Sequence, residues 1–360
     1  MFVIRLTSNG ETMSKGRILV TGGCGYIGSH TIVDLIDSGY DVVSIDNLVN
    51  SSVEALKGIK AITGKVIENI NCDLSDLEEA IQQVKRFGPF DGIIHFAALK
   101  SVEESVYQPT RYFHNNVGST VTTMAMMDEL NIPNLIFSSS CTVYGAPEKL
   151  PVTEDTPISR AENPYGATKQ ACEILYDQYF KSQSVKSAES VVKSGISLRY
   201  FNPAGAHSSA LIGESSLQDP TNLVPVITGT AMGLRSELIV YGDDYPTRDG
   251  SCVRDYVHVM DLARAHTIAL DYLLQKRNEL PYDVYNLGMG EGVTVLEAIH
   301  AFESSTGVKV NYKIGPRRPG DVAAIYADNK RITDRLGWKP TRDITSIMQS
   351  AWEWEKARRK

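Results

Sequence analysis

The sequence lacks several features that would assign it to common classes of protein. Its five cysteines form an odd set without a C-x-x-C pair, which argues against a disulfide framework and favours a reducing compartment. The seven histidines are scattered and form no H-E-x-x-H motif, so we expect no metal site. No stretch approaches the roughly 20 apolar residues of a membrane span, and the apolar run at the N-terminus is too short for a signal peptide. These absences lead us to expect a cytoplasmic protein without a membrane partner.

A basic surface is missing as well. Lys and Arg number 36 and Asp and Glu 43, so the net charge is −7, whereas a nucleic-acid-binding protein normally carries a basic patch. The apolar fraction of 42% and the charged fraction of 22% are those of an ordinary globular protein. A chain of 360 residues suits one large domain or two linked domains.

The first half of the chain alternates apolar, β-branched runs with helical patterns. The runs predict strands at residues 17–21, 41–46, 65–71, 92–97, 135–138 and 196–201, with helices between them, notably at 75–87 and after Pro164. Apolar strands joined by helices indicate a parallel sheet that is buried on both faces. We therefore predict an α/β fold with a Rossmann-type, doubly wound parallel sheet.

Beyond residue 204 the pattern becomes irregular and rich in Gly, Pro, Asp and Ser, which predicts a smaller α/β C-terminal substrate domain. We expect an N-terminal extension at residues 1–14, an NAD-binding domain at 15–203 and a UDP-sugar-binding domain at 204–360, with an approximate boundary across which elements can interleave. A Ser- and Lys-rich stretch at 181–194 is expected to be a surface insertion.

A glycine-rich turn follows the first predicted strand. In the segment VTGGCGYIGSH, Gly22, Gly25 and Gly28 give a G-x-x-G-x-x-G spacing before a predicted helix. Such glycines let the backbone approach a pyrophosphate at the N-terminus of the helix. Asp46 ends the second predicted strand, where a carboxylate binds the adenosine ribose and repels a 2′-phosphate. The combination predicts NAD rather than NADP; the alternative is that Asp46 only caps a strand.

A second motif combines Ser140, Tyr165 and Lys169. Asn163 and Pro164 are typical of a helix start, so Tyr165 and Lys169 should share one face of a helix. We expect the ammonium and a cationic nicotinamide to lower the pKa of the phenol, so that Tyr165 takes a proton from a substrate hydroxyl that Ser140 holds in line. The alternative is a half-buried Tyr165 and a solvated Lys169.

These motifs resemble the extended short-chain dehydrogenase/reductase superfamily. The blocks HFAALKSVEESV, FSSSCTVYG, NPYGATK, LRYFNPAGAH and VRDYVHVMDLA make the chain similar, from about residue 15 to 354, to the UDP-glucose 4-epimerase family. The resemblance implies a homodimeric isomerase of galactose metabolism that binds NAD and interconverts UDP-glucose and UDP-galactose through oxidation at C4, rotation of a 4-keto sugar and hydride return. It implies a catalytic role for Ser140, Tyr165 and Lys169. The dimer would form through helices near residues 108–130 and 167–181.

The resemblance also implies roles for the matching positions. The implied cofactor-binding residues are Gly22, Gly25, Tyr26, Ile27, Gly28, Asp46, Asn47, Leu48, Val49, Asn50, Ser51, Asp73, Leu74, Phe96, Ala97, Ala98, Leu99, Lys100, Asn115, Ser140, Tyr165, Lys169 and Phe201. The implied substrate-binding residues are Lys100, Ser140, Tyr165, Asn202, Asn222, Leu223, Tyr241, Arg254, Arg318, Asp321 and Ile325. Arginine forks suit a diphosphate, and the alternative for Arg318 is a charged residue on a solvated loop. Ile325 stands where the family limits the 2-substituent of the sugar, and it is neither small nor aromatic, which leaves N-acetylated sugars open.

Two other functions fit parts of the motif set. A nucleotide-sugar 4,6-dehydratase would need an acidic pair after Ser140, where the chain has Cys141, Thr142 and Val143. A non-catalytic NAD-sensing module would be expected to have lost part of the Ser–Tyr–Lys set, which is intact here.

Overall fold

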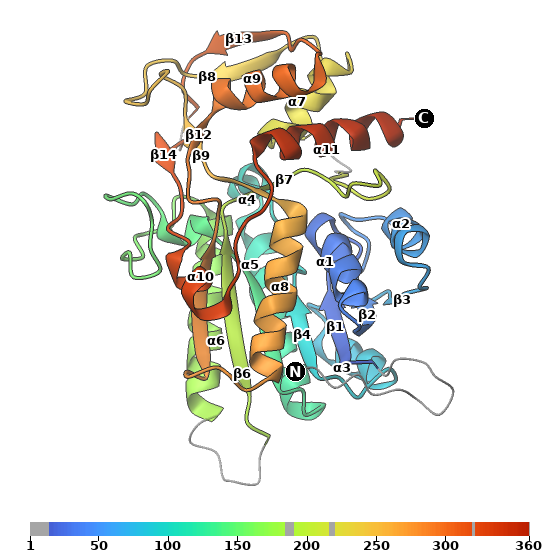
Figure 1. Cartoon of the computed structure of the whole chain (residues 1–360). Coiled ribbons are helices and arrows are strands. Elements are labelled where there is room, and N and C mark those ends of the chain that lie inside the picture. Colours follow the sequence, from blue (N-terminus) through green and yellow to red (C-terminus); the bar gives the residue numbers. More distant parts are fainter. Residues whose placement is uncertain (1–13, 184–190, 216–219, 319–320, 360) are drawn as a thin grey trace.

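The computed structural model describes residues 14–183, 191–215, 220–318 and 321–359, and its centre is a parallel sheet (Figure 1). In this part of the chain the sheet has seven strands in the order β11-β6-β5-β4-β1-β2-β3, and all neighbours are parallel. The strands are β1 (Arg17–Thr21), β2 (Asp41–Ile45), β3 (Glu68–Ile70), β4 (Gly92–His95), β5 (Asn134–Ser140), β6 (Ser194–Tyr200) and β11 (Tyr282–Leu287). This order confirms the predicted Rossmann-type fold.

Helices cover both faces of the sheet because successive residues of a strand point to opposite sides. In β1, Ile18 and Val20 belong to one apolar core and Leu19 to the other. The first core is covered by α1 (Tyr26–Asp37), α2 (Glu54–Thr63), α8 (Val259–Leu274) and α10 (Lys330–Leu336). The second is covered by α3 (Leu77–Lys85), α5 (Pro109–Glu129) and α6 (Pro164–Gln183), with the short α4 (Val102–Tyr107) before α5. The sheet is therefore doubly wound, as predicted.

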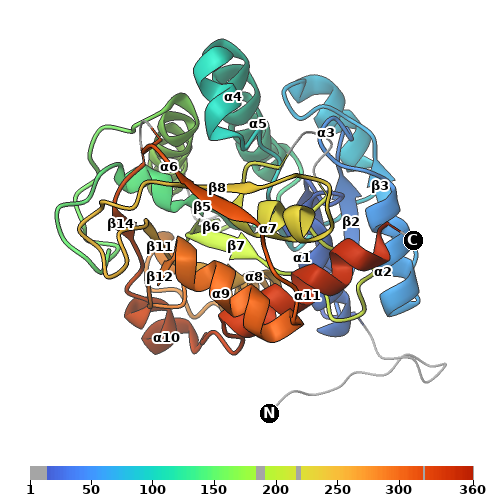
Figure 2. The ribbon, with the colours of Figure 1, turned by 90° about the horizontal axis from the view of Figure 1, so that it is seen from above.

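A smaller layer lies beyond the carboxyl ends of the strands (Figures 1 and 2). Its short strands are β7 (Asn202–Ala204), β8 (Leu238–Tyr241), β9 (Val253–Arg254), β10 (Tyr256–His258), β12 (Val293–Thr294), β13 (Tyr312–Gly315) and β14 (Ala324–Ile325). Its helices are α7 (Leu223–Ala231), α9 (Val295–Thr306) and α11 (Ile344–Ala357). Ile227, Phe302 and Met348 join these helices in a core of their own, and Figure 2 shows α9 and α11 side by side in front of α8. This layer is the irregular C-terminal part that the sequence predicts.

The boundary expected near residue 204 does not divide the sheet. Both α8 and the edge strand β11 come later in the chain, and they pack on α1 and pair with β6. The elements thus interleave, and the assignment of the two parts as cofactor and substrate domains stays a prediction. Residues 1–13 of the expected extension and 184–190 of the expected insertion lie outside the described residues.

All predicted strands except β1 differ somewhat from their predicted bounds, and β3 and β5 differ most in length. The edge strand β3 covers Glu68–Ile70 only, because α2 ends at Thr63 with Gly64 in the left-handed region and the exposed Val66 faces solvent. In contrast, β5 continues to Ser140, since Ser138, Ser139 and Ser140 all pair with β6. Among the described helices, none combines the length and the apolar character needed to cross a membrane.

Candidate active site

The glycine turn forms a close backbone cradle between β1 and α1. Gly22 has a φ of +68°, and a Cβ on Gly28 would lie 2.2 Å from the carbonyl oxygen of Gly22. Helix α1 begins after Gly25 without a cap from any described side chain, so its N-terminus presents backbone N–H groups. The Tyr26 hydroxyl donates to the carbonyl of Gly205 at 2.6 Å and ties this turn to the smaller layer. The turn therefore fits the pyrophosphate of a dinucleotide.

Asp46 lies next to the glycine turn rather than only capping a strand. Its carboxylate accepts hydrogen bonds from the Cys24 N–H at 3.0 Å, the Leu48 N–H at 2.9 Å and the Ser51 hydroxyl at 2.7 Å. In the adjoining loop after β3, Asp73 accepts from Asn47 at 3.1 Å. The loops after β2 and β3 thus hold two carboxylates at the sheet edge, where a ribose and a base would follow the pyrophosphate.

The loop after β4 is fixed by a buried asparagine that the sequence analysis did not single out. Asn116 exchanges hydrogen bonds with the backbone of Leu99, at 2.8 and 3.1 Å, and donates to Thr168 of α6 at 3.0 Å. Its neighbour Asn115, the residue implied by the resemblance, is half-buried on the same helix. The contact with Thr168 sets the predicted cofactor loop 96–100 against the helix that carries Lys169.

Lys100 reaches across to the smaller layer. Its ammonium lies 3.3 Å from the carboxylate of Glu214, which also accepts from the Asn222 amide at 2.9 Å. The backbone carbonyl of Glu214 accepts from the Trp354 indole of α11 at 2.9 Å. Two predicted ligand-binding residues from different layers, Lys100 and Asn222, are therefore joined by one carboxylate that the sequence analysis missed.

Ser140, Tyr165 and Lys169 meet at the carboxyl end of β5. Tyr165 and Lys169 lie on the first turns of α6, as predicted, and Lys169 is buried rather than solvated, with an exposed fraction of 3%. Its Nζ donates to the carbonyl of Ser138 at 2.6 Å and lies 5.9 Å from the centroid of the Tyr165 ring. A side-chain hydrogen bond joins Ser140 to Tyr165.

The electrostatics of this set differ in part from the prediction. Burial raises the pKa of Tyr165 to about 12, and the hydrogen bond from Ser140 opposes that rise. Burial lowers the pKa of Lys169 to about 8, against the attraction of the nearby Cys172 and Glu173. The expected lowering of the Tyr165 pKa by Lys169 is therefore not found in the chain alone.

A buried ion pair lies behind Ser140, Tyr165 and Lys169. Arg199 of β6 binds both oxygens of Glu173 at 2.9 and 2.6 Å, and Glu173 also accepts from the Ser139 hydroxyl. Arg199 further donates to the Tyr144 hydroxyl at 2.8 Å, and Tyr144 donates to Asn286 at 2.7 Å. These contacts fix the end of β5 against α6, one turn beyond Lys169.

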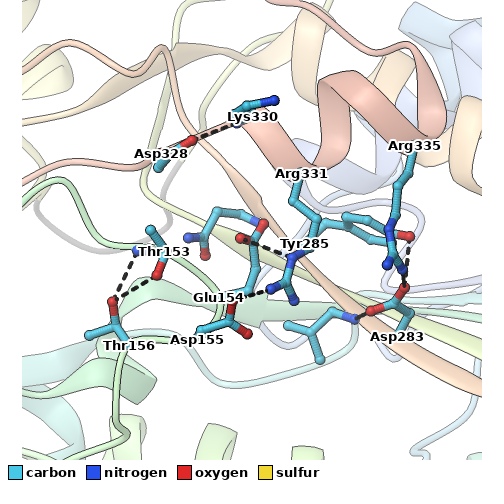
Figure 3. A network of polar contacts seen from close by, with 12 residues as sticks. Thr153, Glu154, Asp155, Thr156, Asp283, Tyr285, Asp328, Lys330, Arg331 and Arg335 are labelled. Atoms are coloured by element: carbon cyan, nitrogen blue, oxygen red, sulfur yellow. Dashed lines mark hydrogen bonds and ion pairs between the residues drawn. The ribbon is translucent and has the colours of Figure 1, made fainter.

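The same network continues to the surface at α10 (Figure 3). The backbone N–H of Asn286 donates to Glu154 at 2.8 Å, and Arg331 lies between Glu154 and Asp155 at 3.5 and 2.5 Å. Beside it, Arg335 pairs with Asp283 at 2.9 Å. The polar contacts therefore connect the loop after η1 (Cys141–Tyr144) with β11 and α10.

Two arginines of the predicted substrate set share one carboxylate. Asp321 accepts from Arg254 at 3.2 Å and from Arg318 at 3.0 Å, and the Arg318 guanidinium lies 5.4 Å from the centroid of the Tyr241 ring. Arg318 is thus half exposed but paired. Ile325 on β14 is buried in a small apolar cluster with Phe201, which follows β6. The guanidiniums and the aromatic ring fit a nucleoside diphosphate.

The structure brings most predicted residues to one edge of the sheet. The predicted cofactor-binding residues lie in the turns that follow β1, β2, β3, β4 and β6, at the end of β5, on the first turns of α1 and α6, and, for Asn115, on α5. Most of the predicted substrate-binding residues come from the smaller layer, namely Asn202, Asn222, Leu223, Tyr241, Arg254, Arg318, Asp321 and Ile325. In the described part of the chain, no three His, Cys, Asp or Glu side chains are grouped as ligands of a metal ion.

The sheet, the glycine turn and the Ser–Tyr–Lys set define an extended short-chain dehydrogenase/reductase. The family model described as GDP-mannose 4,6 dehydratase matches residues 19–351. UDP-glucose 4-epimerase of Bacillus subtilis (strain 168) is 45% identical over 338 residues, which are 94% of this chain and 96% of the relative. The Drosophila melanogaster UDP-glucose 4-epimerase is 43% identical over 351 residues, 95% of this chain and 97% of the relative.

Solved structures give the same answer. UDP-glucose-4-epimerase from Stenotrophomonas maltophila, with bound NAD and formylated UDP-arabinopyranose, is 42% identical with a TM-score of 0.89, and the match covers 96% of this chain and 99% of that one. The enzyme from Bifidobacterium longum, in complex with NAD+ and UDP, is 43% identical with a TM-score of 0.87 and coverage of 95% and 98%. The chain belongs to the family that the dehydratase model describes and, within it, to the UDP-glucose 4-epimerases.

Proposed function

We propose that this protein is an NAD-dependent isomerase that interconverts UDP-glucose and UDP-galactose. The observation that carries the proposal is the meeting of Ser140, Tyr165 and Lys169 at the sheet edge where the glycine turn opens, with Lys169 Nζ 5.9 Å from the centroid of the Tyr165 ring. It is supported by relatives of matching length that are UDP-glucose 4-epimerases and by structures of relatives in complex with NAD and UDP.

Different parts of the cofactor would contact different residues of the site. Gly22, Gly25 and Gly28 would receive the pyrophosphate, Asp46 the adenosine ribose, and Lys169 the nicotinamide ribose. When bound, NAD supplies a reversible hydride acceptor for C4 of the sugar.

Tyr165 and Ser140 would handle the proton of the sugar. Tyr165 Oη would accept the proton of the sugar 4-hydroxyl and later return it, so the same oxygen serves both directions of the reaction, and Ser140 would assist by donating its own proton to that oxygen. Arg254 and Arg318 would hold the diphosphate through both half-reactions, which allows the sugar to turn without leaving the site.

The test is the incubation of purified, cofactor-loaded protein with UDP-galactose, followed by chromatography of the products. We expect UDP-glucose, and loss of turnover by at least about 100-fold in Tyr165→Phe with NAD still bound. Tyr312→Phe, on the exposed strand β13, is the matched control and should keep its activity. No interconversion, or a 4-keto-6-deoxy sugar as product, would refute the proposal.

We propose that Ile325 helps set the range of sugars. Its side chain packs with Val143 and Phe201, so the size of the residue at position 325 would limit the space for a sugar that binds beside β14. The measurement is the ratio of UDP-GalNAc turnover to UDP-galactose turnover. This ratio should rise above the wild-type value in Ile325→Ala and fall below it in Ile325→Tyr. An unchanged ratio would remove Ile325 from the site.

We further propose a homodimer formed through α5 and α6. These helices pack together, and exposed apolar side chains lie on them and on α4, including Tyr107, Phe113, Val121 and Ile174. Light scattering should give twice the chain mass, reduced in Ile174→Glu but not in Ile314→Glu on β13. A monomeric wild type would contradict the proposal.

The five free cysteines support a cytoplasmic location, which fractionation of cells would test.

A further inference from the structure

The hydroxyl of Ser140 is engaged by the residue two positions further on. Ser140 Oγ accepts a hydrogen bond from the Thr142 N–H at 3.2 Å and another from the Thr142 hydroxyl at 3.0 Å. A serine hydroxyl has two acceptor positions and one proton. Because Thr142 occupies both acceptor positions, Ser140 can make its remaining hydrogen bond, the one with Tyr165, only as the donor.

The position of Thr142 is itself fixed by packing. It lies on the short helix η1 that follows β5, and its carbonyl accepts from the Gly145 N–H at 3.2 Å. Gly166, next to Tyr165 on α6, has no side chain at this contact; a Cβ there would lie 3.2 Å from the Thr142 carbonyl oxygen and 3.4 Å from the Thr142 Cβ. The close approach of η1 and α6 thus holds Thr142 beside Ser140 and against the first turn of α6, next to Gly166.

We propose that Thr142 is a positioning residue of the active site, whose hydroxyl directs the proton of Ser140 toward the oxygen of Tyr165. The inference rests on the proposed epimerase function, since it assigns Thr142 to the proton transfer at that tyrosine. Thr142 acts through Ser140 and takes no proton from the substrate.

The direction of the Ser140–Tyr165 hydrogen bond decides which form of the phenol is favoured. A donor to the tyrosine oxygen stabilises phenolate, whereas an acceptor of its proton stabilises phenol. Without the Thr142 hydroxyl, Ser140 regains an acceptor position and can turn to accept from Tyr165. The loss of this one hydroxyl should therefore raise the pKa of Tyr165.

Other groups around Tyr165 remain in place when Thr142 changes. Lys169 and Cys172 face it from α6, Cys141 from η1 and Tyr200 from β6. Their charges are the same in every variant at position 142. A difference in the pKa of Tyr165 between such variants is consequently due to the hydroxyl at position 142 and not to the other charged groups around the tyrosine.

The experiment compares Thr142→Val, which removes only the hydroxyl, with Thr142→Ser, which keeps it. For the NAD-loaded enzyme and UDP-galactose, we expect kcat of Thr142→Val to fall about tenfold at neutral pH, and the rising limb of its pH profile to move up by about one pH unit. KM should stay within about twofold, and Thr142→Ser should restore both kcat and the profile. Should Thr142→Val fail to fold, Thr142→Ala carries the same expectation.

A second readout does not depend on turnover. Tyrosinate absorbance of the holoenzyme is titrated against pH, and the curve of the matching Tyr165→Phe variant is subtracted for each background. The difference should shift to higher pH in Thr142→Val and stay near wild type in Thr142→Ser.

The outcomes separate this inference from the proposed function. A raised KM with an unmoved pH profile would make Thr142 a substrate contact, and lower thermal stability with an unmoved titration would make it merely structural; either result overturns the proposal. Failure of the wild type to interconvert the sugars refutes the epimerase function, and the tyrosinate titration then still decides whether Thr142 directs Ser140.

Discussion

Mild acid should destabilise this fold through histidines that are buried in the neutral form. His30 on α1, His95 on β4, and His258 and His266 around α8 are all at most 3% exposed. Burial lowers the pKa of His30 and His95 to about 3, helped in His95 by the charge of Lys169, and lowers the pKa of His258 and His266 to about 4. The perturbation is a change from pH 7 to pH 5.

The sign follows from the protons bound in each state. Because the folded pKa values lie below the unfolded value of about 6.5, the unfolded chain binds more protons, and stability is lost as the pH falls through 6.5 toward the folded values. At pH 5 each histidine removes about 2 kcal/mol, so the group removes about 8 kcal/mol. Buried Asp255, with its pKa raised to about 6, takes up a proton first in the folded state and offsets about 1 kcal/mol. The net loss of about 7 kcal/mol is comparable to the whole stability of a typical protein.

The measurement is the free energy of unfolding in urea at pH 7.5, 6 and 5, followed by circular dichroism. The slope against pH should be steep in wild type and reduced by about one quarter in His266→Gln, which removes one of the four groups. His114→Gln, at an exposed position on α5, should leave the slope unchanged. A free energy that is flat between pH 7.5 and 5, or an equal slope in His266→Gln, would refute the reasoning.

Two further predictions concern the cofactor cradle and the pair behind the active site. In Gly28→Ala the new Cβ would lie 2.2 Å from the Gly22 carbonyl oxygen, so the amount of NAD retained through gel filtration should fall sharply and Tm should drop. The control Gly118→Ala on α5, where the nearest atom is 3.7 Å away, should keep both the NAD and the Tm of the wild type. Full NAD occupancy in Gly28→Ala would contradict the proposed pyrophosphate site. In Glu173→Gln the buried Arg199 loses its charged partner, which should lower the free energy of unfolding in urea by about 3–5 kcal/mol. The control Glu54→Gln, in an exposed pair with Lys57, should change this free energy by less than about 1 kcal/mol. Equal changes in the two variants would show that burial of the pair does not determine its effect.

Strong local patterns made much of the fold predictable. The run 17–21 is β1 with the same bounds, because apolar β-branched residues in a central parallel strand are buried on both sides. The glycine turn and the helix start at Pro164 were found for similar reasons, since few residue types satisfy a close backbone approach or the first turn of a helix. The ends of the strands were predicted less accurately than their positions. The strand β3 is shorter than predicted because it lies at the edge of the sheet, and β5 is longer because its last residues pair with β6.

Contacts between distant residues had no signal in the sequence. Glu214 binds Lys100 over a separation of 114 residues, and Glu173 meets Arg199 only because α6 packs beside β6. Asn116 shows the same limit at shorter range. The resemblance implies a role for its neighbour Asn115, whereas the buried Asn116 is the residue that fixes the loop after β4 through the backbone of Leu99. Such roles depend on tertiary packing, which neither periodicity nor motif spacing encodes.

The same argument applies to the chemistry of Tyr165. Its distance of four residues from Lys169 predicted that the two would share a helix face, and they do, but proximity to an ammonium does not set the pKa of a phenol that is also desolvated. The buried Lys169 donates one of its three N–H groups to the Ser138 carbonyl, and burial lowers the pKa of Lys169 to about 8. The chain's own device that favours phenolate is then the hydrogen bond from Ser140, whose direction depends on Thr142. A motif of three residues thus requires a fourth, because a hydroxyl acts as a donor only when its acceptor positions are filled.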